Sequence, residues 1–360
     1  MKRYLKLGLV ILLSEKTLSL YGMDLPEAFP VDFPPVIAQH VQIYHPHIQT
    51  DELEMARQLA KLSYTSEDFL DPSMKASMKY KAFEAKTGLF SSEQSHCGFV
   101  AQKEDETFIV SIRGTRMTSL NDWGTNINTG IWDGIKDPAL LGISGQVHTG
   151  FYKYGKSVFE NIWPDLLVPI DQKFQAWIQT QPSNVSMEEI NKGYVNILKN
   201  VKFEIHGHSL GGAGAHIVAL MIKKALQDKI FYIDGTSSFD SDVKLFTFES
   251  PRVCNRQAAA EFDKFIGKEN HIRVIQKNPS AYIFHTDPVT GVSLGAFGFK
   301  HTGTLFVNEL QTKEDRESAE FHLHSMAPIK DVQQGFEKGE KNVSTMKKIF
   351  AGVKKLFFRQ

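Results

Sequence analysis

Two kinds of hydrophobic periodicity meet near the middle of the chain, between residues 201 and 220. Apolar and polar residues alternate from Val201 to His206, the pattern of a strand with one apolar face. From Ala213 onward the apolar residues recur with a helical period. The pattern therefore predicts a strand, then a sharp turn that carries Ser209, then a helix.

Strand-like and helix-like segments alternate over most of the remaining sequence. This alternation predicts an α/β fold with a mostly parallel central sheet and helices on both faces. The segments are a helix over Glu52–Ser63, a hairpin of strands Cys97–Gln102 and Thr107–Ile112, a helix from Tyr152 to about Leu167, and strands Val243–Phe248 and His271–Gln276.

Composition narrows the class of protein. The chain has 360 residues, 42% of them hydrophobic, which is enough for one large domain or two ordinary ones with a sizeable core. Its 41 basic residues balance 41 acidic ones, so no electrostatic field favours a nucleic-acid partner. Cys97 and Cys254 are too few and too far apart to define a disulfide framework or a zinc site, and whether they pair stays open.

The turn at Ser209 has the spacing of a nucleophile elbow, because Gly207 and Gly211 flank the serine two residues away on each side. A serine between a strand and a helix lies in strained backbone, where side chains at the flanking positions would collide with neighbouring elements. The helix that follows directs its N–H groups toward the space above the serine, where an oxyanion would form. A glycine-rich structural turn is the alternative explanation.

The second hairpin strand ends in Arg113-Gly114-Thr115, a loop that can supply another oxyanion donor through the backbone N–H of Thr115. Met117, Leu120 and Trp123 follow at a spacing of three. Such a stripe is typical of a core helix, but directly after an oxyanion loop it could also form a small lid.

In an α/β-hydrolase arrangement an acid and then a histidine must follow the serine along the chain. Asp287 begins a turn after an apolar stretch and is the best-placed acid, whereas Asp263 lies in a helical stretch and is expected to be a solvated surface charge. The candidate bases are His301, His322 and His324, and spacing alone does not choose among them.

Taken in order, these motifs resemble those of the class 3 lipases, the family of fungal and plant triacylglycerol lipases and their bacterial relatives. The resemblance covers residues 52–329. It rests on Ile112-Arg113-Gly114-Thr115, Asp122-Trp123, Val147-His148-Thr149-Gly150-Phe151, the elbow with Gly212, Ser250-Pro251-Arg252-Val253 with Asn255, and Asp287-Pro288-Val289.

The resemblance implies a role for each matching position. Ser209 would be the nucleophile, Asp287 the acid, and His324, which precedes Ser-Met, the base. Thr115 and Leu210 would be the oxyanion donors.

The segment Met117–Trp123 would be the lid, and His301 would be structural rather than catalytic. The chain departs from the family at Glu249 and Cys254, where glycine is usual, and the approach to Asp287 is longer than in the family.

The expected organisation has four parts. Residues 1–22 resemble a secretory signal, with basic residues ahead of an apolar run too short to span a bilayer, so we expect a secreted or periplasmic protein. Residues 23–50 would be an N-terminal arm or linker, and residues 51–330 the α/β-hydrolase lipase domain with a helical insertion near 168–200. Residues 331–360 would form a basic amphipathic helix, suited to an anionic membrane surface or to docking on its own domain.

The sequence therefore predicts a serine lipase that hydrolyses carboxylic esters of lipids, with triacylglycerol-type substrates, through an acyl-enzyme. Neither a metal nor an organic cofactor is implied. The alternatives are a phospholipase or a small-ester or thioester hydrolase with the same triad, and a catalytically silent module that binds lipid or membrane.

Overall fold

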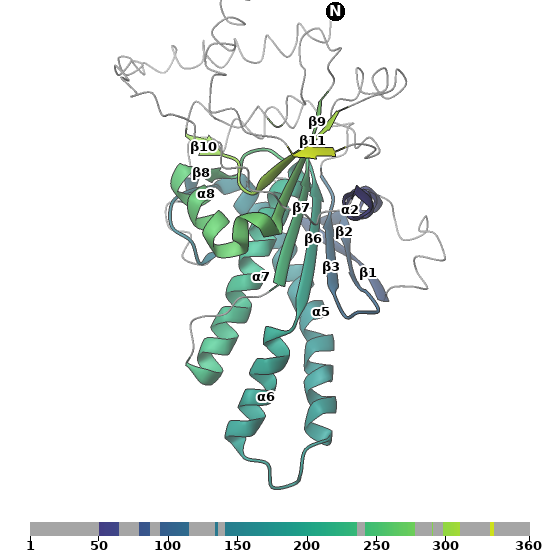
Figure 1. The fold of residues 1–360 in the computed structure, drawn as a ribbon, viewed down its shortest axis with the longest axis vertical. Helices are drawn as coiled ribbons and strands as arrows, with labels where there is room; N and C mark the ends of the chain where they lie inside the picture. The colour runs from purple at the N-terminus through teal and green to yellow at the C-terminus, as the bar shows by residue number, and fades with distance from the viewer. Residues whose placement is uncertain are drawn as a thin grey trace, which may run out of the picture.

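The computed structural model describes residues 50–64, 79–86, 94–114, 134–135, 141–235, 242–277, 290, 298–309 and 332–334. Their main feature is an eight-stranded sheet in the order β1-β2-β3-β6-β7-β9-β11-β12 (Figure 1). The strands are β1 Lys79–Lys86, β2 Gln94–Gln102, β3 Phe108–Ile112, β6 Lys202–His208, β7 Asp242–Phe248, β9 His271–Lys277, β11 Thr304–Glu309 and β12 Val332–Gln334.

The five central strands of this sheet, from β3 to β11, run parallel, whereas β1, β2 and β12 are antiparallel at its two edges. Parallel strands end at the same edge, so the residues that follow β3, β6, β7 and β9 gather there. A second sheet joins four two-residue strands, β10 Phe299–Lys300, β8 Cys254–Asn255, β5 Val147–His148 and β4 Gly134–Ile135.

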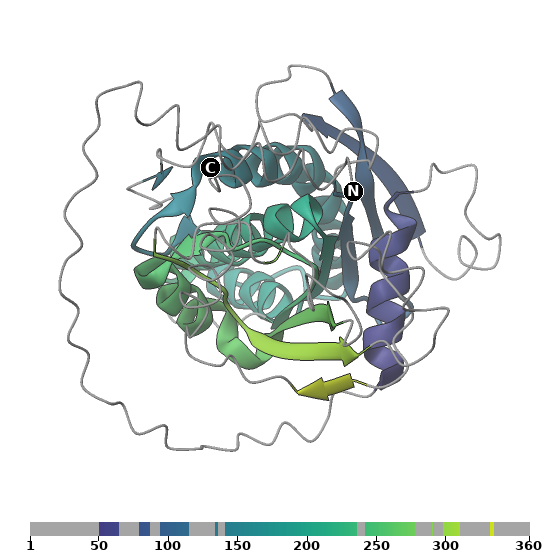
Figure 2. The ribbon, with the colours of Figure 1, turned by 90° about the horizontal axis from the view of Figure 1, so that it is seen from above.

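Helices cover both faces of the large sheet, which confirms the predicted fold class (Figure 2). Helix α2 (Thr50–Leu62) packs on β3, β6 and β7 from one side. Helices α5 (Thr149–Gln179) and α7 (Leu210–Asp234) pack on the other side, with α6 (Met187–Lys199) against both. The short helix α8 (Arg256–Phe262) lies between β8 and β9 in the chain.

The alternation along β6 explains how it is buried on both faces. Phe203 and Ile205 belong to the large core beneath α5 and α7. Glu204 and His206 point to the opposite face, where His206 stacks on Phe246 of β7 with ring centroids 5.1 Å apart. The face of β6 that carries these polar side chains is therefore covered by α2 instead of solvent.

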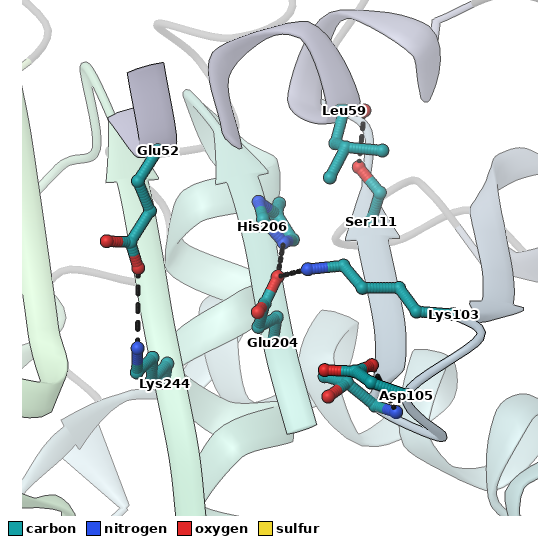
Figure 3. Close-up of polar contacts among 9 residues, drawn as sticks. Glu52, Leu59, Lys103, Asp105, Ser111, Glu204, His206 and Lys244 are labelled. Atoms are coloured by element: carbon teal, nitrogen blue, oxygen red, sulfur yellow. Dashed lines mark hydrogen bonds and ion pairs between the residues drawn. The ribbon is translucent and has the colours of Figure 1, made fainter. Parts of the chain in front are cut away.

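Polar contacts attach α2 to the sheet (Figure 3). The Ser111 hydroxyl of β3 donates to the carbonyl of Leu59 at 2.8 Å, and Lys244 of β7 pairs with Glu52 at 3.3 Å. Beneath them Lys103 pairs with Glu204 at 2.7 Å. Burial alone would raise the pKa of Glu204, but its close contacts with the His206 ring, 3.7 Å away, and the Lys103 ammonium outweigh burial and lower that pKa to about 2.

Helix α5 extends well beyond the predicted Tyr152–Leu167 and passes through Pro164 and Pro169. Its extra turns pack against α6, with the rings of Phe174 and Tyr194 4.4 Å apart. Tertiary packing thus outweighs the tendency of proline to end a helix.

Cys97 and Cys254 are buried free thiols, and burial raises the pKa of both. Within the described ranges no helix has both the length and the apolar character needed to cross a membrane. The predicted helix over residues 331–360 is wrong at its start, because Val332–Gln334 form strand β12, which pairs with β11. The predicted signal, the arm over 23–49, the lid and residues 335–360 lie outside the described residues.

Candidate active site

Ser209 occupies a one-residue turn between β6, which ends at His208, and α7, which begins at Leu210. Its backbone has φ 58° and ψ −127°, a region that costs a non-glycine residue about 1–3 kcal/mol. The Ser209 N–H donates to the carbonyl of Phe248 at the end of β7 (2.9 Å), and its own carbonyl accepts from Ala213 (3.2 Å). The predicted strand, turn and helix are therefore present, and hydrogen bonds on both sides hold the strained serine.

The glycines around Ser209 are required by close backbone contacts. A Cβ atom on Gly207 would lie 2.4 Å from the carbonyl oxygen of Gly211, and one on Gly211 would lie 2.2 Å from that of Ile112. A Cβ on Gly212 would lie 2.7 Å from the Cβ of Ser250. A side chain at Gly207 would push β6 and the start of α7 apart, and one at Gly211 or Gly212 would push the elbow away from the end of β3 or from the segment after β7.

The end of β3 lies directly beside the candidate nucleophile. A Cβ on Gly114 would be 3.0 Å from the Cβ of Ser209 and 2.6 Å from the carbonyl of His208. Leu210 is the first residue of α7, so its N–H is one of the helix N-terminal groups without an intrahelical acceptor. The loop that leads to Thr115 and the N-terminus of α7 thus flank Ser209 from two sides, as an oxyanion site requires.

Tyr64 links this loop to the elbow. Its phenolic oxygen accepts from the Gly114 N–H at 3.0 Å and bonds Nδ1 of His208 at 2.7 Å. Which of the two groups donates in the second bond depends on the tautomer of His208, because the phenolic oxygen can accept two hydrogen bonds and also donate one. Burial raises the pKa of the Tyr64 phenol well above its ordinary value, so the phenol stays protonated.

Tyr154 of α5 holds the preceding residue of the same loop. Its hydroxyl donates to the carbonyl of Arg113 at 2.7 Å, while the Arg113 N–H donates to the carbonyl of Cys97 at 2.7 Å. Neither Tyr64 nor Tyr154 was identified from the sequence. Tyr64 follows the end of α2 and Tyr154 lies in α5, and both are far along the chain from the residues that they bind. Nothing in the sequence around either tyrosine indicates these contacts.

Glu249 follows β7 directly and is 1% exposed. Its φ is 50°, in the left-handed region that disfavours non-glycine residues by about 1–2 kcal/mol. One carboxylate oxygen, Oε1, accepts from the Gln276 N–H of β9.

Farther along the same segment, Asn255 caps α8 by accepting from the Ala258 N–H at 2.8 Å.

The described histidines other than His208 have structural contacts. His216 donates from Nδ1 to the carbonyl of Gly212 at 2.7 Å, and its Nε2 lies 3.0 Å from the hydroxyl of Thr302. The same hydroxyl bonds His271 at 3.0 Å. Burial lowers the pKa of His216 to about 4 and that of His271 well below its ordinary value.

His301 bonds the carbonyl of Thr290 at 3.1 Å, and burial lowers its pKa as well. Asp263 was expected to be a solvated surface charge, and the structure corrects this. It accepts from the Gly303 N–H at 2.7 Å, because the turn before β11 passes over the helical segment that carries it.

The structure therefore brings Ser209, Leu210 and the start of the Thr115 loop together. The other predicted site residues lie outside the described part of the chain. They are Thr115, Met117, Leu120, Trp123, Asp287, His322 and His324.

Comparison with known families identifies the family of the chain. The family Lipase (class 3) matches residues 109–290, just over half of the chain, and the match includes β3 from its second residue, the elbow and the segment after β7. The chain belongs to the class 3 lipases. As a member of this family it is a hydrolase of carboxylic esters.

The chain is similar to solved lipase structures, and the one with a TM-score above 0.5 supports the fold. A non-glycosylated lipase of Yarrowia lipolytica is 17% identical with a TM-score of 0.51, over 80% of this chain and 87% of that one. A Rhizomucor miehei lipase in complex with its propeptide is 20% identical with a TM-score of 0.45, over 71% of this chain and 67% of that one. A comparison of the sequence with curated proteins gave no match.

Proposed function

We propose that this lipase cleaves carboxylic esters of lipids, of the triacylglycerol type, through a triad of Ser209, Asp287 and His324. The observation that carries the proposal is the backbone of Ser209, held in a strained turn between Gly114 at the end of β3 and the N-terminus of α7. A serine held in this way presents its hydroxyl beside two backbone segments. The N–H groups of these segments can stabilise the negative charge of an oxyanion.

In the proposed reaction His324, oriented by Asp287, takes the proton of the Ser209 hydroxyl as the oxygen attacks the ester carbonyl. The N–H groups of Leu210 and Thr115 stabilise the resulting oxyanion. The histidine returns the proton to the leaving alcohol as the carbon–oxygen bond breaks. Water, activated by the same histidine, then hydrolyses the acyl-enzyme and releases the fatty acid.

The direct test is Ser209→Ala, assayed with emulsified triacylglycerol and with a soluble short-chain ester. We expect the substitution to reduce kcat by about 10⁴-fold or more, because the nucleophile is lost. Full activity in Ser209→Ala would refute the assignment. A wild-type protein that folds and binds lipid vesicles but cleaves no ester would instead indicate a silent binding module.

The substrate class is tested by comparing triacylglycerol with phospholipid, short-chain esters and thioesters. We expect the highest kcat/KM with triacylglycerol above its solubility limit, where a lid over residues 117–123 would open at the interface. A clear preference for phospholipid or thioester would overturn this part of the proposal.

We further propose that the enzyme is exported by its N-terminal signal. We also propose that residues 341–360 form a helix with one apolar face and one basic face, which contacts anionic membrane. Removal of these twenty residues should weaken binding to anionic vesicles and leave kcat on a soluble ester intact. Unchanged vesicle binding would exclude the membrane contact. An N-terminal sequence that still begins at Met1 in exported material would exclude the signal.

A further inference from the structure

Glu249 is a buried carboxylate at the carboxyl end of β7, the strand beside β6. The two strands pair as far as His208 and Phe248, and the Phe248 carbonyl is the acceptor of the Ser209 N–H at 2.9 Å. Glu249 is the next residue after Phe248. Glu249 is therefore bonded directly to the residue whose carbonyl holds the turn of the proposed nucleophile, Ser209.

Two unfavourable features coincide at this position. The backbone has φ 50°, where glycine is favoured, and the side chain is 1% exposed although it carries an acid. Glycine, the usual residue here in the class 3 pattern, would avoid both. Strained residues and buried ionisable groups that persist in a fold are concentrated at active sites.

The carboxylate lies at the edge of the sheet where a triad would assemble. The pairing of β7 with β9 ends at Phe248 and Val274, and the Glu249 N–H extends it by donating to the Val274 carbonyl at 3.1 Å. Its Oε1 then accepts from the N–H of Gln276, two residues farther along β9. The side chain thus continues in the direction of the strands, past their paired ends, toward the carboxyl edge.

We propose that Glu249 is a positioning residue of the triad, whose carboxylate stabilises the imidazolium formed when the catalytic histidine takes the Ser209 proton. This inference rests on the proposed function. In the proposed role the Glu249 carboxylate is ionised throughout, and no bond to it is made or broken. A buried site has a low effective dielectric constant, so a carboxylate there would act strongly on an imidazolium that forms beside it. Glu249 comes from the strand next to β6, whereas Asp287 follows β9, two strands away.

Glu249→Gln tests the role of the charge, because glutamine retains a side-chain oxygen that can accept from Gln276. With a soluble short-chain ester we expect kcat to fall by about a hundredfold or more, with little change in KM and in Tm. The rate of labelling by a fluorophosphonate should fall in parallel, because that reaction also needs an activated serine.

Glu249→Gly is the second variant, which removes the carboxylate and also relieves the backbone. It should match or exceed the wild-type Tm and still lose kcat. Glu204→Gln is the matched control, because it removes a partly buried carboxylate from β6 near the opposite edge of the same sheet. We expect the control to lower Tm without a change in kcat for the folded protein.

The inference is wrong if Glu249→Gln keeps kcat within about threefold of the wild-type value. It is equally wrong if Glu249→Gly lowers Tm while folded protein keeps full kcat, since the residue would then have only a structural role. Failure of wild-type Ser209 to react with the fluorophosphonate would refute the proposed function itself, and the inference with it.

Discussion

Tyr64→Phe should uncouple the oxyanion loop from the elbow while leaving the hydrophobic packing of the ring in place. The substitution removes the oxygen that accepts from the Gly114 N–H at 3.0 Å and bonds His208 at 2.7 Å. Thr115, the proposed oxyanion donor, is the next residue after Gly114. The change is therefore expected to shift the proposed oxyanion N–H of Thr115 without replacing any group that would touch the substrate.

The expected magnitude follows from these two hydrogen bonds. Each contributes about 0.5–1.5 kcal/mol net, so their loss should lower the free energy of unfolding by about 1–3 kcal/mol. Complete loss of one oxyanion donor reduces kcat by about 10²–10³-fold. A loop that is loosened but still attached through Arg113 and Tyr154 should lose part of this, about tenfold in kcat, equivalent to about 1.4 kcal/mol.

The assay combines steady-state kinetics on a soluble short-chain ester with urea unfolding of the same preparation. Tyr194→Phe is the control, because it also removes one phenolic hydroxyl, which donates to Asp171 at 2.8 Å on the distant helix pair α5 and α6. The control should lose some stability and keep kcat. Tyr64→Phe with wild-type kcat per folded molecule would refute the positioning role of Tyr64.

Two further predictions concern the elbow and the buried histidines. Gly211→Ala should abolish esterase activity and leave little soluble protein in an expression assay, because its Cβ would lie 2.2 Å from the Ile112 carbonyl; an active, stable variant would refute the close contact. The pKa of His216 is lowered to about 4 from 6.5, so its stabilising effect is complete above pH 6.5 and is lost as pH falls through pH 4. Urea unfolding should show His216→Gln less acid-sensitive than wild type by about 3 kcal/mol between these pH values, and parallel pH profiles for the two proteins would contradict the assignment.

The elbow and the parallel sheet could be predicted because their causes are local. The alternation before Ser209 and the helical period after it specify the two elements, and glycine at 207 and 211 marks a turn with no room for Cβ atoms. The strand and helix segments that flank the elbow then define the α/β class. These features depend on residues a few positions apart, which is the range over which periodicity carries information.

The supporting contacts could not be predicted because they join distant segments. Tyr64 is 144 residues from His208 in the chain, and Tyr154 is 41 residues from Arg113. Asp263 was misjudged for the same reason, since its partner is a backbone N–H 40 residues away. Glu249 was visible in the sequence as a departure from the family, but its strained backbone and its bond to β9 appear only in the folded chain.

The most direct test of the account is the site at which a fluorophosphonate reacts. The folded enzyme should be incubated with the probe, and the modified peptide identified by mass spectrometry alongside residual activity on triacylglycerol. The account predicts a single adduct on Ser209, with activity lost in proportion to labelling and no adduct in Ser209→Ala. An active enzyme whose adduct lies on another residue, or whose activity survives complete labelling of Ser209, would contradict it.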